Sequence, residues 1–252
     1  MTIKDIHLNK YSDTNHPKVD GKAAFRDSGY NQIISTISHE LRTPVAIIKS
    51  NIQLLRKFSY NMAEPVLEES FSLCEESVED VTRFLDNIQL LNSANKSRIH
   101  PVFSSFRTKR IIHHLFSWLD QMNLDSHRVV LHWDLKDQEI VSDKKYLSQI
   151  ILNILSNALK FSKEKVQLFI GTSHKELSIM VHDSGIGIPE HEIEEIFQPF
   201  SRASNVKQYA GTGLGLAIVH GMVENLGGEI QVSSDVGKGT VIQIIIPYEL
   251  SN

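Results

Sequence analysis

Two stretches in the first third of the chain repeat apolar residues every three or four positions. After Tyr30 the repeat consists of Ile34, Ile37, Leu41, Val45, Ile48, Ile52 and Leu55. Beyond a short polar break at 59–63 it continues, in steps of four and three, as Leu67, Phe71, Cys74, Val78, Val81, Leu85 and Ile88. This spacing places apolar side chains along one face of a helix. It predicts two long helices joined by a short loop in an all-α antiparallel hairpin. Because one hairpin leaves much of each apolar face in water, we expect a dimeric four-helix bundle.

The heptad repeat ends before a stretch at 92–105 that is rich in Ser and Asn and contains Pro101, which we interpret as a domain boundary. Beyond it helices are predicted at 107–123, 143–162 and 213–226, and strands at 129–135, 166–171, 177–183, 229–234 and 240–248. This order is typical of an α+β helix-on-sheet sandwich. We therefore divide the chain into a leader or linker at 1–28, a helical domain at 29–97 and an α+β domain at 98–252.

Composition narrows the classes of function. A formal net charge of −4, with no cluster of Lys and Arg, argues against a nucleic-acid partner. The sequence contains no apolar run long enough to cross a bilayer and no apolar core of a secretory signal, so we expect a cytoplasmic location. The single cysteine, Cys74, excludes an internal disulfide, and we expect it to be a small buried apolar residue.

An acidic series runs along the second predicted helix, between its apolar positions. It consists of Glu64, Glu68, Glu69, Glu75, Glu76, Glu79 and Asp80. A solvated outer face and a docking surface are both compatible with this pattern, and the solvated face is the favoured interpretation.

A histidine in the first predicted helix has a chemically suggestive setting. His39 lies two residues after Ile37 and two before Leu41, which places it off the apolar face and toward solvent. Glu40 is adjacent and could polarise the imidazole, and Thr43 lies one turn further along the same face. A neutral imidazole is a competent nucleophile near neutral pH. A lone surface histidine would have no special role. Whether His39 is a nucleophile therefore depends on its neighbours and on the rest of the chain.

Polar and glycine-rich segments in the second domain could bind a nucleotide. Asn153, Asn157 and Lys160 fall on one stripe of a predicted helix, where amide oxygens can hold Mg²⁺ and a lysine can hold phosphate. Asp183 follows a predicted strand, where it could accept a hydrogen bond from an exocyclic amine. The following segment includes Gly185 and Gly187, which let the backbone approach a planar base.

A second glycine-rich segment precedes the last predicted helix. It contains Gly211, Gly213, Leu214 and Gly215, whose backbone amides would lie at the positive end of the helix dipole. Such a helix N-terminus can cradle phosphate. The chain contains no GxxxxGK[ST] phosphate loop and no protein-kinase HRD or DFG motif.

Together these segments resemble the sensor histidine kinases of two-component systems. The resemblance extends over about residues 30–248, through HELRTP at 39–44, NILSNALKF at 153–161, DSGIGIP at 183–189, FQPF at 197–200 and GTGLGLAIV at 211–219. It implies a dimerisation and phosphoacceptor domain followed by an ATPase domain of the type shared with gyrase and heat-shock chaperones. It also implies that the chain is either a cytoplasmic kinase or the cytoplasmic part of a membrane-bound one.

The resemblance also implies roles for individual residues. His39 would accept the γ-phosphate of ATP, with Glu40 as hydrogen-bond acceptor or base, and would pass it to an aspartate on a response regulator receiver domain. Thr43 would help to position water when the regulator is dephosphorylated. Asp183 would bind the adenine amino group and Thr240 would approach the base. Asn157 would bind Mg²⁺, and Phe197 and Phe200 would hinge a lid formed by 201–210.

Two other functions remain open at this level. A chaperone- or gyrase-like ATPase would hydrolyse ATP without phosphorylating protein, but it would leave the HELRTP segment unexplained. A non-catalytic dimeric scaffold would not need a complete set of nucleotide-site residues.

Overall fold

The computed structural model describes residues 27–95, 101–113, 115–134, 139–173, 175–206, 209 and 211–250. Its contacts divide the chain into two compact units, Gly21–Leu90 and a second unit that takes in Leu91–Asn252. All but the last two residues of the predicted leader lie outside the described residues. The sequence-based boundaries of the two domains therefore stay predictions.

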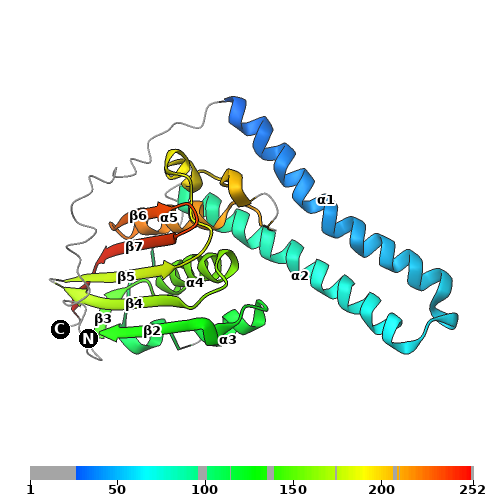
Figure 1. Cartoon of the computed structure of the whole chain (residues 1–252), viewed down its shortest axis with the longest axis horizontal. Coiled ribbons are helices and arrows are strands. Elements are labelled where there is room, and N and C mark those ends of the chain that lie inside the picture. The colour runs from blue at the N-terminus through cyan, green and yellow to red at the C-terminus, as the bar shows by residue number, and fades with distance from the viewer. Residues whose placement is uncertain are drawn as a thin grey trace. The chain divides into compact units, whose positions relative to one another are not determined.

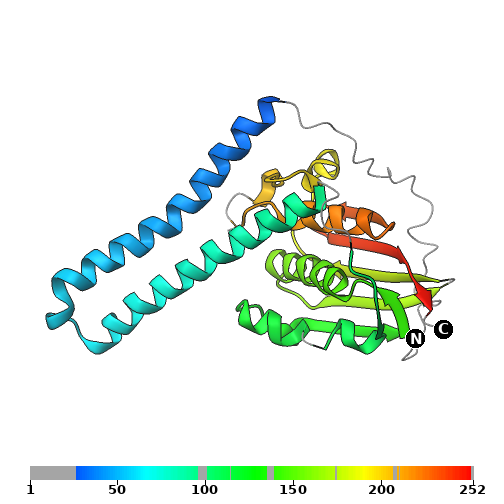
Figure 2. The same ribbon diagram turned by 180° about the vertical axis from the view of Figure 1, so that it is seen from behind.

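The first unit is a helical hairpin. Helix α1 spans Asp27–Phe58, a 3₁₀ turn spans Ser59–Asn61, and helix α2 begins at Glu64 and ends at Asn95. Figures 1 and 2 show α1 and α2 side by side and antiparallel. Their contact includes Cys74, whose Sγ lies 3.9 Å from the carbonyl oxygen of Ile48. The predicted hairpin is confirmed, while Cys74 is only half-buried.

The apolar faces of the hairpin are only partly covered within one chain. Positions such as Leu41 and Val81 are half-buried. In the alternate rows of the repeat, large side chains stay in solvent: Ile34, Val45, Ile52, Phe71, Val78 and Leu85, which are between 46% and 54% exposed. The predicted apolar repeats therefore do form continuous helix faces. A single hairpin buries only part of each face.

The second unit is built on a five-stranded sheet with the order β2-β4-β5-β7-β6. The strands span Val129–Asp134 (β2), Val166–Ser173 (β4), Glu176–Asp183 (β5), Glu229–Asp235 (β6) and Gly239–Pro247 (β7). β2 pairs with β4 in parallel, and all other neighbours are antiparallel. The register of β5 against β7 places Asp183 opposite Thr240.

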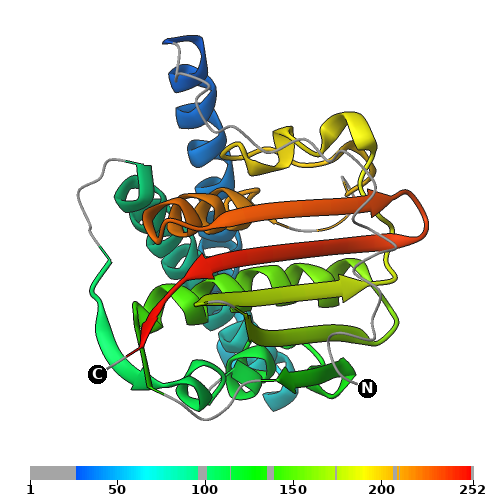
Figure 3. The ribbon, with the colours of Figure 1, turned by 90° about the vertical axis from the view of Figure 1, so that its left-hand side faces the viewer.

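Three helices cover one face of this sheet: α3 (Leu115–Gln121), α4 (Lys144–Phe161) and α5 (Gly215–Asn225). Figure 3 shows the sheet toward the viewer, with the helices behind it. Alternate strand residues such as Leu168, Ile179 and Ile244 are buried beneath α4 and α5. Helix α4 begins where the Asp143 carboxylate caps it by accepting from the Tyr146 amide at 3.0 Å. The helix-on-sheet prediction is confirmed.

A second, three-stranded sheet was not predicted. It has the order β1-β3-β8 and consists of Ser104–Arg107, Glu139–Ser142 and Glu249–Leu250. The helix predicted at 107–123 is wrong in its first half, where β1 leads into a 3₁₀ turn at Thr108–Ile111 before α3. Strands of two to four residues are too short to show a period, so their formation depends on pairing across the fold.

Candidate functional site

His39 lies on the exposed surface of α1, as its position off the apolar face predicts. Its side chain is 74% exposed, and its Nδ1 atom lies 3.7 Å from Oε1 of Glu40. That distance is too long for a hydrogen bond, but it places the carboxylate beside Nδ1 and leaves Nε2 unobstructed by it. Thr43 is exposed one turn further along. The two side chains therefore share an accessible face of the hairpin.

In the second unit, Asp183 ends β5 and is only 7% exposed. Its Oδ1 accepts a hydrogen bond from the amide of Gly185 at 2.7 Å, and the Thr240 backbone also bonds to the carboxylate. Burial raises the pKa of Asp183 above its ordinary value, while the Gly185 and Thr240 amides and the charge of His182 oppose the rise. A buried carboxylate with few partners is suited to pairing with a donor on a ligand.

The loop after Asp183 packs closely against the backbone of two other segments at Gly185 and Gly187. A Cβ on Gly185 would lie 2.5 Å from the carbonyl oxygen of Phe161 at the end of α4, and the amide of Ile186 donates to that same oxygen at 3.3 Å. Gly187 has a φ of +67°, and a Cβ there would lie 2.0 Å from the carbonyl oxygen of Asp235. Both positions need glycine because of the close approach of backbone.

Thr240 is buried beside this loop and joins a hydroxyl pair. Its Oγ1 lies 2.8 Å from Oγ of Ser234, which also donates to the carbonyl of Gly239 at 2.9 Å and accepts from the amide of Ile188 at 2.8 Å. Because the one Ser234 proton goes to that carbonyl, Thr240 is the donor within the pair. Its remaining lone pairs are available to a ligand.

The stripe of Asn153, Asn157 and Lys160 on α4 faces the glycine-rich segment before α5. A Cβ on Gly215 would lie 3.5 Å from Oδ1 of Asn153 and 3.9 Å from Nδ2 of Asn157. A Cβ on Gly211 would lie 2.8 Å from Nζ of Lys160. The structure thus brings together two groups of predicted residues that are about 55 positions apart in sequence.

Two polar groups in this stripe are poorly satisfied by the protein. Nδ2 of Asn153 is buried and has no hydrogen-bond partner among the described residues. Burial lowers the pKa of Lys160, and the nearby charge of Arg202 lowers it further. An unpaired amide donor, a desolvated lysine and a neighbouring exposed arginine are groups that an anion would satisfy.

The N-terminus of α5 is shaped for a close backbone contact. Gly213 has a φ of +69°, and a Cβ there would lie 2.6 Å from the carbonyl oxygen of Ser201. Leu214 is fully buried and occupies the N-cap position without a side-chain cap, after which α5 begins at Gly215. With Asn153, Asn157 and Lys160 opposite, these residues fit a phosphate group and its divalent cation, through amide donors, side-chain oxygens and a lysine.

The predicted lid residues have different environments. Phe197 is 5% exposed, with its ring centroid 5.6 Å from that of His220. Phe200 is half-buried and has a φ of +65°. Of the predicted lid, residues 201–206 and 209 are described. The guanidinium of Arg202 donates to the carbonyls of Val206, at 2.8 Å, and Tyr209, which orders these turns.

Sequence reasoning missed several residues of this region. Ser234 joins the loop after β5 to Thr240, Asn205 donates to the Gly187 carbonyl, and Glu192 accepts from the Ser204 amide. None of these residues belongs to a motif. Ser234 looks like an ordinary strand residue, and Asn205 lies in a polar stretch without a period.

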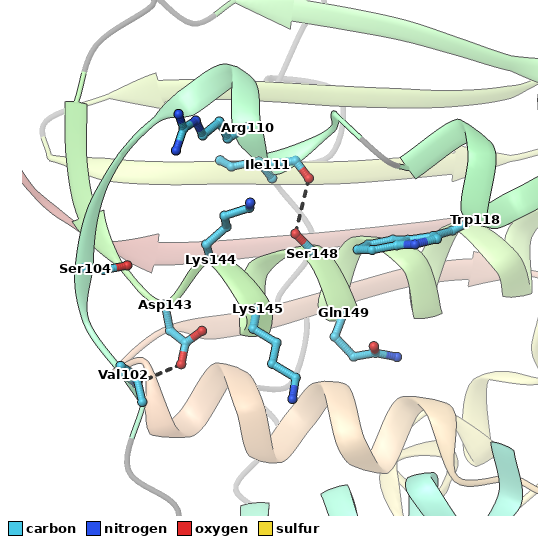
Figure 4. Close-up of a pocket in the computed structure, with 10 residues that line it drawn as sticks. All are labelled: Val102, Ser104, Arg110, Ile111, Trp118, Asp143, Lys144, Lys145, Ser148 and Gln149. Atoms are coloured by element: carbon cyan, nitrogen blue, oxygen red, sulfur yellow. Dashed lines mark hydrogen bonds between the residues drawn. The ribbon is translucent and has the colours of Figure 1, made fainter. Parts of the chain in front are cut away.

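A separate cavity of about 560 Å³ lies at the other end of α4 and contains none of the predicted site residues. Figure 4 shows it between the first turns of α4, Trp118 of α3 and the β1 region. Both oxygens of Asp143 are used there, by the amides of Tyr146 and Val102, and Ser148 donates to the Ile111 carbonyl at 3.3 Å. Asp143 thus holds the start of α4, and Ser148 joins the same helix to the Ile111 carbonyl.

Other sites were also sought in the part of the chain that the structure describes. It contains no group of three or more His, Cys, Asp or Glu side chains that could hold a metal ion. Among the same residues, no helix has the length and apolar character needed to cross a membrane.

Both units match described domain families. Residues 30–96 match the His Kinase A (phospho-acceptor) domain, and residues 142–250 match the histidine kinase-, DNA gyrase B- and HSP90-like ATPase family.

Similar curated proteins are sensor kinases. The autoinducer 2 sensor kinase/phosphatase LuxQ of Vibrio cholerae is 33% identical over 87% of this chain and 26% of its own length. The signal transduction histidine-protein kinase ArlS of Staphylococcus haemolyticus is 31% identical over 85% of this chain and 48% of its own length. The chain therefore spans between about a quarter and a half of these relatives.

Solved structures show the same fold. The histidine kinase AdeS of Acinetobacter baumannii superposes with a TM-score of 0.65 at 23% identity, covering 85% of this chain and 98% of that one. The histidine kinase ThkA, solved in complex with the response regulator protein TrrA, gives a TM-score of 0.62 at 22% identity, over 86% of this chain and 61% of that one.

Proposed function

Because the chain belongs to the sensor histidine kinase family, we propose that it transfers the γ-phosphate of ATP to its own His39 and then to an aspartate of a response regulator. The observation that carries the nucleotide half of this proposal is the meeting of Asn153 and Asn157 with Gly215 across α4 and α5. It puts side-chain oxygens, amide donors and the cation of Lys160 at one place.

In this scheme the loop after β5 binds adenine and the end of α4 binds phosphate. Asp183 accepts a hydrogen bond from the exocyclic amine, and Thr240 offers a lone pair to the same base. Lys160 and the amides of 211–215 neutralise and orient the phosphates. Asn157 would hold Mg²⁺, which would supply positive charge to balance the charge on the phosphate oxygens.

The nucleophile follows from the geometry of His39. A small movement that brings Glu40 within hydrogen-bond distance of Nδ1 would favour the tautomer that carries its proton on Nδ1 and would leave the lone pair on Nε2. Nε2 bonds to the γ-phosphorus as the bond between that phosphorus and the β,γ-bridging oxygen breaks, and ADP leaves. The resulting phosphoramidate is a labile donor to a carboxylate.

We also propose that the hairpin forms a homodimer. The exposed rows that include Val45, Ile52, Val78 and Leu85 give each hairpin an apolar face that the described residues leave largely uncovered. A second hairpin would bury these rows in a four-helix bundle. The domain boundaries at 29–97 and 98–252 belong to the same proposal, and the matched ranges 30–96 and 142–250 support them.

The test is incubation of the whole chain with Mg²⁺ and γ-labelled ATP, followed by separate acid and alkali treatment. We expect a protein-bound label that acid removes and alkali does not, and that is absent from His39→Gln. The matched control is His191→Gln, because His191 is also exposed and lies 3.7 Å from a neighbouring glutamate, Glu192. This control should keep the label.

Two results would contradict the proposal. A label of unchanged strength in His39→Gln would exclude this residue as the phosphoacceptor. Free labelled phosphate without any labelled protein would instead indicate an ATPase of the gyrase or chaperone type.

A further inference from the structure

A polar contact joins the lid to the loop that follows β5. Asn205, in the 3₁₀ turn Ser204–Val206, donates from Nδ2 to the carbonyl oxygen of Gly187 at 2.8 Å. The reverse orientation of the amide would set two acceptor oxygens against each other, so this orientation is the one that bonds. The contact spans 18 positions of sequence and connects two segments that the proposed function uses separately.

The acceptor in this contact has little freedom to move. Gly187 has a left-handed φ and lies against the Asp235 carbonyl, as described above. On one side of it, the Ile186 carbonyl accepts from the amide of Gly237 at 2.9 Å. On the other side, the amide of Ile188 donates to Ser234 at 2.8 Å. Asn205 therefore bonds to a backbone position that is fixed from both neighbours.

The hydrogen bonds continue from this loop to the proposed adenine site. Ser234 links the Ile188 amide to the hydroxyl of Thr240, and the backbone of Thr240 bonds to the Asp183 carboxylate. A change at the base that shifts Asp183 or Thr240 is thus transmitted through few contacts to the carbonyl that Asn205 holds.

Asn205 also has an unsatisfied group. Its Oδ1 atom is buried and accepts from no donor among the residues that the structure describes. A buried acceptor without a donor destabilises the state in which it occurs. A nucleotide carries amine and hydroxyl donors. A nucleotide bound beneath the lid would therefore supply the hydrogen-bond donor that Oδ1 of Asn205 lacks among the described residues.

We propose that Asn205 is a positioning residue that fastens the lid to the base-binding loop, so that a bound adenine nucleotide and a docked lid stabilise each other. This inference rests on the proposed nucleotide-binding function and adds a residue to it. Coupling of this kind is reciprocal: weakening the contact between lid and loop must also weaken retention of the base.

A neighbouring contact supplies the control. Ser204 is exposed and donates from its backbone amide to Oε2 of Glu192 at 2.9 Å. Ser204→Ala removes a hydroxyl from the same turn but keeps that amide. Asn205→Ala removes the side-chain donor, and Asn205→Asp keeps the shape while placing a carboxylate against the Gly187 carbonyl.

The experiment measures release of fluorescent N-methylanthraniloyl-ADP from the whole chain, after mixing with excess unlabelled ADP. Loss of one hydrogen bond predicts dissociation about fivefold faster for Asn205→Ala. Asn205→Asp should release the nucleotide at least as fast, and Ser204→Ala should match the wild type. Loss of the bond to Gly187 should slightly lower the melting temperature of both Asn205 variants even without nucleotide, whereas Ser204→Ala should match the wild type. The nucleotide-induced increase in melting temperature should be smaller in the Asn205 variants.

A second probe tests the link to the base. The corresponding inosine diphosphate derivative lacks the exocyclic amine, so the effect of Asn205→Ala on its release should be smaller. An equal effect on both nucleotides would overturn the coupling, as would wild-type release rates in both Asn205 variants. Failure of the wild type to bind either nucleotide would instead overturn the proposed function together with this inference.

Discussion

The Cβ position of Gly187 lies 2.0 Å from the carbonyl oxygen of Asp235, at a backbone φ of +67°. Gly187→Ala would therefore meet both a left-handed backbone and a backbone clash, and we expect a loss of about 3 kcal/mol in the free energy of unfolding. Gly237→Ala is the matched control, because its φ is +78° but nothing lies within 4 Å of its Cβ position. It should cost about 1 kcal/mol. Urea denaturation measures both, and equal losses would contradict the clash.

Asp183 should make stability depend on pH. Burial raises its pKa above 3.8, so the folded protein binds this proton more tightly than the unfolded chain. The stabilising contribution is complete below the unfolded pKa and is lost as pH rises through the folded pKa. Asp183→Asn removes this dependence, so its stability relative to wild type should improve as pH rises from about 4 to about 7. Urea midpoints of the two proteins across this pH range test the prediction. A difference in stability that stays constant with pH would refute it. Nucleotide binding should nevertheless be lost.

Lys160 should lower the stability of the protein without nucleotide and strengthen the binding of ATP. Burial and Arg202 lower its pKa, so its charged form is disfavoured in the folded protein. Lys160→Gln should stabilise the protein without nucleotide near pH 7, and this gain should shrink as pH rises toward the ordinary lysine pKa of 10.5. It should also weaken ATP binding by about tenfold or more, because a hydrogen bond to a charged group is lost. Calorimetric titration compares it with exposed Lys163→Gln, and similar affinities would count against the assigned role.

Thr43 should matter for only one of two reactions. It is exposed one turn beyond His39 and does not contact the imidazole in any described bond. Thr43→Ala should therefore keep autophosphorylation near the wild-type level and reduce dephosphorylation of a phosphorylated receiver domain. The two rates are measured with γ-labelled ATP and with purified phosphorylated regulator. A parallel fall of both would refute this division of roles.

The exposed rows of the hairpin predict how the dimer can be broken. Val78 is 53% exposed in one chain, and in a bundle Val78→Arg would bury a charge without a partner. We expect the dimer dissociation constant to rise by at least about tenfold. Glu76→Arg introduces the same side chain on the opposite side of α2, within the acidic series, and should leave the dimer intact. Sedimentation equilibrium distinguishes them, and an unchanged Val78→Arg dimer would place the interface elsewhere.

The local pattern of apolar residues was sufficient to predict the long helices and the main strands. The spacing of apolar residues predicted α1, α2 and α4 and the main strands of the sheet, because periods of two and of about 3.6 residues are direct consequences of backbone geometry. It failed at β1, β3 and β8, since strands this short have no period and form only when their partners are in place. The helix predicted at 107–123 failed in its first half because Arg107 ends β1 and a 3₁₀ turn follows at Thr108–Ile111.

For the candidate site, the sequence by itself determined which chemical groups are present and in what order. Asp183, Asn157, Lys160 and the glycines before α5 could be named because their residue types carry the chemistry. Only the tertiary structure decided that Gly215 faces the Asn153 stripe, and that Asn205 bonds to Gly187. Those contacts depend on how α4, α5 and the sheet pack together. Such packing is set by buried surfaces distant in sequence, and no local pattern records it.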